Sequence, residues 1–199
     1  MTATRIVSLL PSATEIICRL GLESQLVGIS HECDYPATIT HLPRLTRPKI
    51  DVHASSRDID TAVRALSTEG LSVYAVDEAL LASLHPDLIV TQDQCEVCAV
   101  DLAEVQRATA TALGYDCPIV SLQPSRLVDV WDSVEYVAYG AGVAKRGATL
   151  RATLETGIRQ IIDSIVRTKP RTIACLEWLD PLMYAGHWTI DLVHYPEPL

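Results

Sequence analysis

Short apolar runs alternate with helix-like segments along the first 140 residues, and this alternation restricts the fold more than any other feature. Each run is bounded by Pro, Gly or polar residues, which is typical of strands. The runs are RIVSLL (5–10), QLVGIS (25–30), LSVYAV (71–76), PDLIVTQ (86–92) and CPIVSL (117–122). Strands that alternate with helices predict a doubly wound α/β lobe, in which helices cover both faces of a parallel sheet.

Capping residues mark the starts of several of the expected helices. Ser12 and Glu15 form an S-x-x-E capping box, in which each side chain satisfies a free backbone N–H at the helix start. Ser55 and Asp77 are N-cap residues for two further helices. The helices that the sequence predicts cover about residues 12–20, 55–68, 77–84, 99–113 and 125–139.

Residues 143–168 follow a different pattern, which predicts one long helix with an apolar face. The apolar residues that recur there at spacings of three and four are Leu150, Leu154, Ile158, Ile161, Ile162 and Ile165. At about 1.5 Å per residue such a helix spans about 40 Å, which is more than one small domain needs. We therefore expect an N-terminal lobe (1–140), a connecting helix (141–169) and an incomplete second α/β lobe (170–199).

Composition and charge exclude several classes of protein. A formal net charge of -9 and the lack of a basic cluster argue against nucleic acid as a partner. No apolar run approaches the roughly 20 residues of a membrane span, and the N-terminal stretch MTATRIVSLLPSATE has no signal-peptide core. The sequence as written favours a cytoplasmic protein, or a periplasmic one if the true start lies upstream. Its six cysteines then indicate thiols or metal ligands rather than disulfides.

The stretch TQDQCEVC (91–98) carries a C-x-x-C motif directly after a predicted buried strand. One interpretation is a thiol–disulfide redox protein that uses Cys95 and Cys98, although the acidic residue between them disfavours a reactive thiolate. A second is a zinc site, completed by His31 and Cys33 from the end of a neighbouring strand. The third is a pair of reduced thiols, one of them packed in the core.

Five features in order resemble the class III periplasmic-binding-protein family, specifically the cobalamin-binding branch that serves ABC importers. They are RIVSLLPSATEIICRLG, LVGISHECDYP, HPDLIVTQ, the long helix and CLEWLDPLMYAGHW, and they extend from residue 5 to about residue 193. The resemblance implies a non-enzymatic protein that holds cobalamin or a related corrinoid between two lobes, with an ABC importer permease as partner. Binding of heme, a siderophore or a metal ion is the alternative within the same fold.

The resemblance also implies where the ligand lies, and sheet geometry points to the same place, because parallel sheets bind ligands beyond the carboxyl ends of their strands. The candidate binding residues at these ends are Pro11, Ser12, Ala13, His31, Glu32, Cys33, Tyr35, Gln92, Asp93 and Cys95. The candidates on the opposite wall are Trp178, His187 and Trp188, whose rings can stack on a corrin. His31 is in addition a candidate axial ligand to cobalt, because imidazole is a suitable donor.

Relatives in this family continue after the matching H-W-T-x-x-L-V with a second lobe similar in size to the first, where this sequence has HYPEPL. We therefore expect a truncated product whose strand near 171–178 has few partners and whose long helix exposes its apolar face. Unpaired strand edges of this kind promote association. The alternative expectation is a homodimer that covers this surface.

Overall fold

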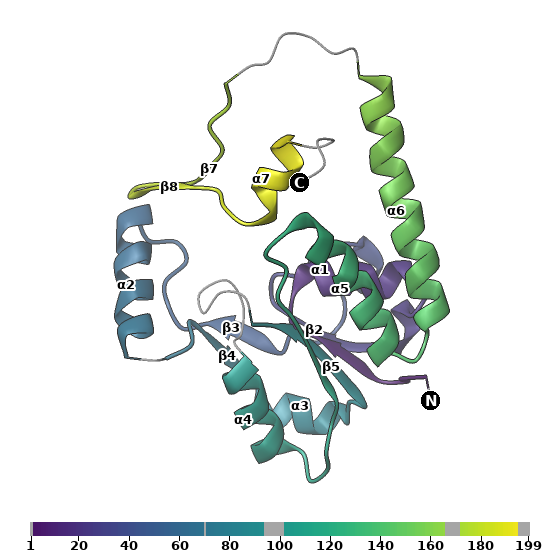
Figure 1. The fold of residues 1–199 in the computed structure, drawn as a ribbon. Coiled ribbons are helices and arrows are strands. Elements are labelled where there is room, and N and C mark those ends of the chain that lie inside the picture. Colours follow the sequence, from purple (N-terminus) through teal and green to yellow (C-terminus); the bar gives the residue numbers. More distant parts are fainter. Residues whose placement is uncertain (1, 70, 94–101, 166–171, 195–199) are drawn as a thin grey trace.

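A central sheet of four parallel strands organises the N-terminal part of the chain (Figure 1). The computed structural model describes residues 2–69, 71–93, 102–165 and 172–194. The strands are β1 (Ile6–Ser8), β2 (Leu26–Ile29), β5 (Leu88–Gln92) and β6 (Ile119–Leu122), in the spatial order β2-β1-β5-β6. Every neighbouring pair is parallel, which confirms the predicted α/β class.

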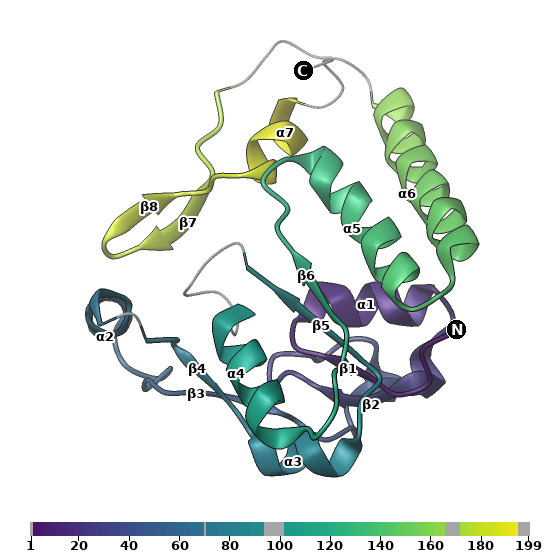
Figure 2. The same ribbon diagram turned by 60° about the horizontal axis from the view of Figure 1, so that its bottom comes forward.

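Helices cover both faces of this sheet, because successive residues of a strand point to opposite sides. Ile6 and Val90 belong to one buried cluster, which includes residues of α1 and α5. Val7 and Ile89 belong to the other cluster, which includes residues of α3 and α4, so that three layers result (Figure 2). The helices are α1 (Pro11–Arg19), α3 (Glu78–Leu84), α4 (Leu102–Ala112) and α5 (Leu127–Gly140).

The strand order creates a switch point between β1 and β5. From β1 the chain passes through α1 to β2 on one side, and from β5 it passes through α4 to β6 on the other. The two connections leave in opposite directions, and their helices lie on opposite faces of the sheet. In doubly wound sheets a crevice opens at this position, outside the carboxyl ends of the two strands.

The start of α1 differs from the sequence prediction. The helix begins at Pro11 with Leu10 as its N-cap residue, and no side chain caps it, so the capping box of Ser12 and Glu15 is wrong. Proline favours the first helical position because its φ angle is already helical and it lacks the N–H that would go unpaired there. As a result, Ser12 lies inside the first turn of the helix with its side chain exposed.

A second, two-stranded sheet stands beside the first. β3 (Thr46–Pro48) and β4 (Tyr74–Val76) pair in antiparallel fashion, so the run 71–76 is a strand but lies outside the parallel sheet. Helix α2 (Ser56–Thr68) connects them and stands away from the parallel sheet (Figure 1). The Ser55 hydroxyl accepts a hydrogen bond from the Asp58 N–H, which confirms the predicted cap.

The long helix is present as α6 (Ala144–Ser164), and it lies beside α5 in both views (Figures 1 and 2). Gly147 is buried against α5, and the Arg151 guanidinium binds Glu135 of α5 and Glu155 of its own helix at 2.7 and 2.9 Å. Ile161 and Ile165, near the far end, are exposed as expected. None of the described helices has the length and apolar character needed to cross a membrane.

The C-terminal segment crosses above the carboxyl edge of the parallel sheet (Figure 1). It consists of the strands β7 (Leu176–Leu179) and β8 (Leu182–Tyr184), which form an antiparallel hairpin, and of α7 (Trp188–His194). At one end of the crossing, Asp180 forms an exposed ion pair with Arg57 of α2 at 2.9 Å. At the other end, α7 contacts α5. The segment is therefore attached to the first lobe on both sides of the sheet edge.

Candidate functional site

The loops that follow the parallel strands form a rim at the carboxyl edge of the sheet. Pro11 starts α1 directly beyond β1, and Gln92 and Asp93 follow β5, so these residues flank the switch point. The Asp93 carboxylate accepts a hydrogen bond from the Gln123 side-chain amide at 2.9 Å. This bond joins the loops after β5 and β6 and fixes both at the rim.

The first turn of α1 divides the predicted residues into exposed and buried ones. Ser12 is exposed and Pro11 is half-buried, so both offer surface at the rim. Ala13 is completely buried in the core and offers none. The backbone N–H groups of this turn have no carbonyl partner within the helix, which gives this end of α1 a partial positive charge.

His31 lies at the end of β2 and is held by a residue of β3. Its backbone N–H donates to the Thr46 hydroxyl oxygen at 3.0 Å, and its ring Nδ1 lies 2.7 Å from the same oxygen. The Thr46 hydroxyl in turn donates to the Ser30 hydroxyl at 3.0 Å. The ring of Tyr74, on β4, lies 5.3 Å from the imidazole between ring centroids.

Burial lowers the pKa of His31 below its ordinary value, because the charged imidazolium is poorly solvated there. Glu32 acts in the opposite direction, and the guanidinium of Arg44, which donates to the Ser30 and His31 carbonyl oxygens, lowers the pKa further. The imidazole is therefore neutral at pH 7. A neutral imidazole keeps one ring nitrogen with a free lone pair.

Cys33 faces the interior of the lobe. It is completely buried, its sulfur lies 3.2 Å from the Thr14 hydroxyl, and burial raises the pKa of its thiol. His31 and Cys33 are thus held by different partners. Across the described ranges of the chain, no group of three His, Cys, Asp or Glu side chains is arranged to hold a metal ion. Cys95 and Cys98 lie outside these ranges, so the zinc and redox interpretations stay predictions.

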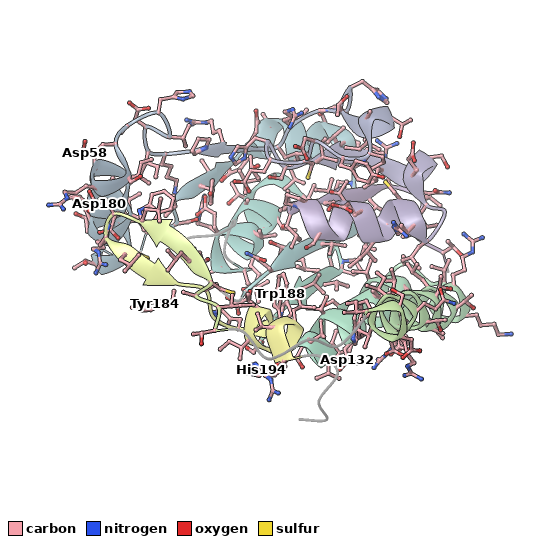
Figure 3. The ribbon with its side chains drawn as sticks, turned by 90° about the horizontal axis from the view of Figure 1, so that it is seen from above. Asp58, Asp132, Asp180, Tyr184, Trp188 and His194 are labelled. Carbon is pink, nitrogen blue, oxygen red and sulfur yellow. The ribbon has the colours of Figure 1, made fainter. Side chains whose placement is uncertain are left out.

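The segment predicted as the opposite wall carries its aromatic residues at two places. The Trp178 indole N–H donates to the Asp180 carbonyl at 3.0 Å, which ties this ring to the hairpin turn. His187 is exposed and has a left-handed φ of 51°, just before α7. Trp188 opens α7 and is 38% exposed, and Figure 3 shows it at the start of this helix.

Glu32 and Tyr35 lie in the loop after β2, and both are exposed. Tyr35 projects 59% of its surface to solvent, next to a cis peptide bond to Pro36. The structure therefore places Glu32, Tyr35 and His31 in one loop at the outer strand of the sheet. Pro11, Ser12, Gln92 and Asp93 lie nearer the switch point.

Sequence reasoning missed two residues on which this site depends. Thr46 orients His31 but lies in a proline-rich loop with no strand pattern. Asp191 of α7 is buried, and its carboxylate accepts from the Arg126 Nε and the Leu127 N–H at 2.9 and 2.7 Å. This contact anchors the C-terminal segment to the first turn of α5. In the sequence, Asp191 looks like any surface acid on a short helix.

One pocket in the C-terminal segment competes with the rim as a ligand site. Its volume is about 290 Å³, and it is bounded by Ile173, Tyr184 and Val193 among others. Pockets for drug-sized ligands usually measure about 300–1,000 Å³. A corrin or porphyrin is larger than this space, so the pocket does not replace the rim.

No protein-family model matches the sequence, and no curated protein matches it. Solved structures with a similar fold include solute-binding proteins. The periplasmic vitamin B12-binding protein BtuF of Vibrio cholerae is 21% identical, with a TM-score of 0.60 over 94% of this chain and 61% of that one. The periplasmic heme-binding protein RhuT of Roseiflexus sp. is 23% identical, with a TM-score of 0.59 over 88% and 55%. An ABC transporter substrate-binding protein of Listeria monocytogenes is 16% identical, with a TM-score of 0.61 over 96% and 61%.

These similarities place the chain in the fold of periplasmic solute-binding proteins, as the sequence resemblance predicts. The chain spans 61% of the Vibrio and Listeria proteins and 55% of the Roseiflexus protein. The matched parts include nearly all of the present chain. What the neighbours share with it is therefore the fold.

Proposed function

We propose that this chain binds a flat metal chelate without catalysing a reaction, and that the ligand is cobalamin or a related corrinoid. The observation that carries the proposal is the position of the rim. Pro11, Ser12, Gln92 and Asp93 lie beyond the carboxyl ends of β1 and β5, at the switch point where doubly wound sheets bind ligands. A segment with exposed aromatic surface crosses above the same edge.

The rim offers the groups that a corrinoid needs. The Ser12 hydroxyl, the backbone N–H groups of the first turn of α1 and the Gln92 amide can hydrogen-bond the peripheral amides of the macrocycle. Trp188, from the segment above, supplies an aromatic face for stacking. Polar groups around an apolar contact surface are typical of binding sites for small molecules.

Non-catalytic binding is favoured because the described rim holds no reactive pair that a substrate can reach. The Thr46 hydroxyl is hydrogen-bonded to His31, as a nucleophile is to its base, but Thr46 is only 5% exposed. The Cys33 thiol is buried, and its raised pKa keeps it protonated at pH 7. Neither the Thr46 hydroxyl nor the Cys33 thiol can therefore attack a bound substrate.

Heme binding is the second candidate, and the neutral imidazole of His31 favours it, because imidazole is a common axial ligand of heme iron. A solved neighbour described as a heme-binding protein supports the same candidate. An ABC importer permease as partner belongs to either form of the proposal. Delivery to a permease requires a location outside the cytoplasm, which cell fractionation tests.

The proposal is tested by titrating the purified chain with hydroxocobalamin and with hemin, followed by absorbance and calorimetry. We expect saturable binding of one chelate per chain. Ser12→Trp should abolish binding, because the new ring fills the rim from an exposed helical position. Ser24→Trp is the matched control, because Ser24 is exposed before β2, at the opposite edge of the sheet. Failure of the wild-type chain to bind either chelate contradicts the proposal.

A further inference from the structure

We infer that Nε2 of His31 coordinates the metal of the bound chelate, and that Thr46 is the positioning residue that leaves this nitrogen free. The inference rests on the proposed function, and it names both the coordinating atom and the class of ligand. That class is a metal chelate with an exchangeable axial position.

The hydrogen bonds of the Thr46 hydroxyl decide which imidazole nitrogen carries the proton. A hydroxyl has one proton to donate and two lone pairs. The Thr46 proton goes to the Ser30 oxygen at 3.0 Å, and one lone pair accepts the His31 backbone N–H. Only the second lone pair is left for Nδ1, at 2.7 Å. Nδ1 must therefore be the donor, and the free lone pair of the neutral ring lies on Nε2.

The imidazole is held in this state by buried neighbours. Thr46 and Ser30 are 5% and 2% exposed, so water does not compete for their hydroxyl groups. Thr46 is also fixed by strand pairing, because it lies opposite Val76 in the β3–β4 sheet. The backbone and the ring of His31 bind one and the same oxygen, which limits rotation of the side chain. An orienting partner on the far nitrogen is what metal-binding histidines generally have.

Nε2 is available for coordination. The His31 side chain is half-exposed, and within the described residues Nε2 makes no hydrogen bond. His31 lies two residues beyond β2 (Leu26–Ile29), in one of the loops that form the rim at the carboxyl edge of the sheet. Cys33, the other predicted metal ligand of this loop, is buried and bound to Thr14, which leaves His31 as the donor.

The coordination step is a ligand exchange without electron transfer. The Nε2 lone pair forms a bond to cobalt of aquocobalamin while the coordinated water leaves as a neutral molecule, and the oxidation state of cobalt stays the same. Hemin in water undergoes the same exchange at iron. Cyanocobalamin carries cyanide at this position, which imidazole does not readily displace, so it serves as the chelate that should bind without ligation.

The tautomer is tested first in the free protein, by long-range proton–nitrogen NMR of histidine labelled with nitrogen-15. We expect the His31 resonances to show a protonated Nδ1 and an unprotonated Nε2. Thr46→Val should remove this preference and Thr46→Ser should keep it, since serine retains the hydroxyl group. Circular dichroism confirms that each variant is folded. A protonated Nε2 in the wild-type chain overturns the inference and leaves the binding proposal unaffected.

Ligation is then tested by the visible spectra of aquocobalamin and hemin. The wild-type chain should shift both spectra, and His31→Ala should abolish the shift. His53→Ala, which removes an exposed histidine from another loop, should retain it. Thr46→Val should weaken affinity by about 10- to 100-fold, the usual effect of losing an orienting partner. Binding with an unshifted spectrum overturns the inference alone, whereas no binding of any chelate overturns the proposed function as well.

Discussion

The packing of α6 on α5 depends on Gly147, and one added methyl group tests it. A Cβ at this position would overlap the Cβ of Ala138 and lie 3.5 Å from the backbone of Val134 and Glu135. These atoms belong to a helix and cannot swing aside as a flexible side chain does. Overpacking of this kind costs about 1–3 kcal/mol. Alanine regains at most about 1 kcal/mol from helix propensity, so we expect Gly147→Ala to lower the free energy of unfolding by about 1–2 kcal/mol.

Gly157, in the same helix, provides the matched control. A Cβ added there meets no atom within 4 Å. Gly157→Ala should therefore raise the free energy of unfolding by about 0.5–1 kcal/mol, through helix propensity and a less flexible unfolded chain. Neither substitution changes the charge, so the contrast between the two variants isolates the contact with α5.

The two variants are compared by urea and thermal unfolding, followed by far-ultraviolet circular dichroism. We expect their stabilities to differ by about 2 kcal/mol, which corresponds to about 4–8 °C in Tm for a chain of this size. Equal stabilisation by both substitutions would refute the close packing of the two helices at Gly147.

Four further predictions concern the C-terminal segment. Asp191→Ala should make the C-terminal segment more sensitive to limited proteolysis while the N-terminal part of the chain stays folded. If the segment is cleaved as slowly in the variant as in the wild-type chain, the contact of Asp191 with Arg126 and Leu127 does not anchor it. Hydrogen bonds from Arg126 and the Leu127 N–H lower the pKa of Asp191, so the anchor should be complete above the ordinary Asp pKa of about 4 and be lost as pH falls through the lowered value. Trp188→Ala should weaken chelate binding about threefold to tenfold in calorimetry if the ring stacks on the ligand. Leu179, which is 74% exposed on the hairpin, should drive dimer formation; Leu179→Glu should reduce it in light scattering, and a wild-type monomer at every concentration rules it out.

The parallel sheet is predictable because each of its strands is marked by residues within a short window of sequence. The run LIVTQ of β5 is apolar where both faces of the sheet are covered, and it ends where polar residues begin. The caps at Ser55 and Asp77 lie three residues before the N–H groups that they satisfy, so a short window of sequence reveals them. Fold class and most helices follow from such patterns.

The parts that escaped prediction depend on distant partners. The Asp191 carboxylate binds Arg126, which is 65 residues earlier in the chain, and the sequence around either residue does not indicate this ion pair. Thr46 lies in a strand of three residues, too short for the alternation that marks a strand. The motif at Ser12 fits a capping box, but the helix starts one residue earlier, at Pro11, because proline favours the first helical position.

Thr46 belongs to the β3–β4 sheet, so the position of that sheet determines whether the Thr46 hydroxyl can bind the His31 imidazole. This small sheet carries α2, and Arg57 at the start of α2 holds Asp180 of the hairpin above the rim. If the β3–β4 sheet slides by one residue, about 3.3 Å, the Thr46 hydroxyl leaves hydrogen-bonding range of the imidazole. The lone pair then no longer stays on one nitrogen. The orientation of the imidazole therefore depends on where the β3–β4 sheet holds the Thr46 hydroxyl.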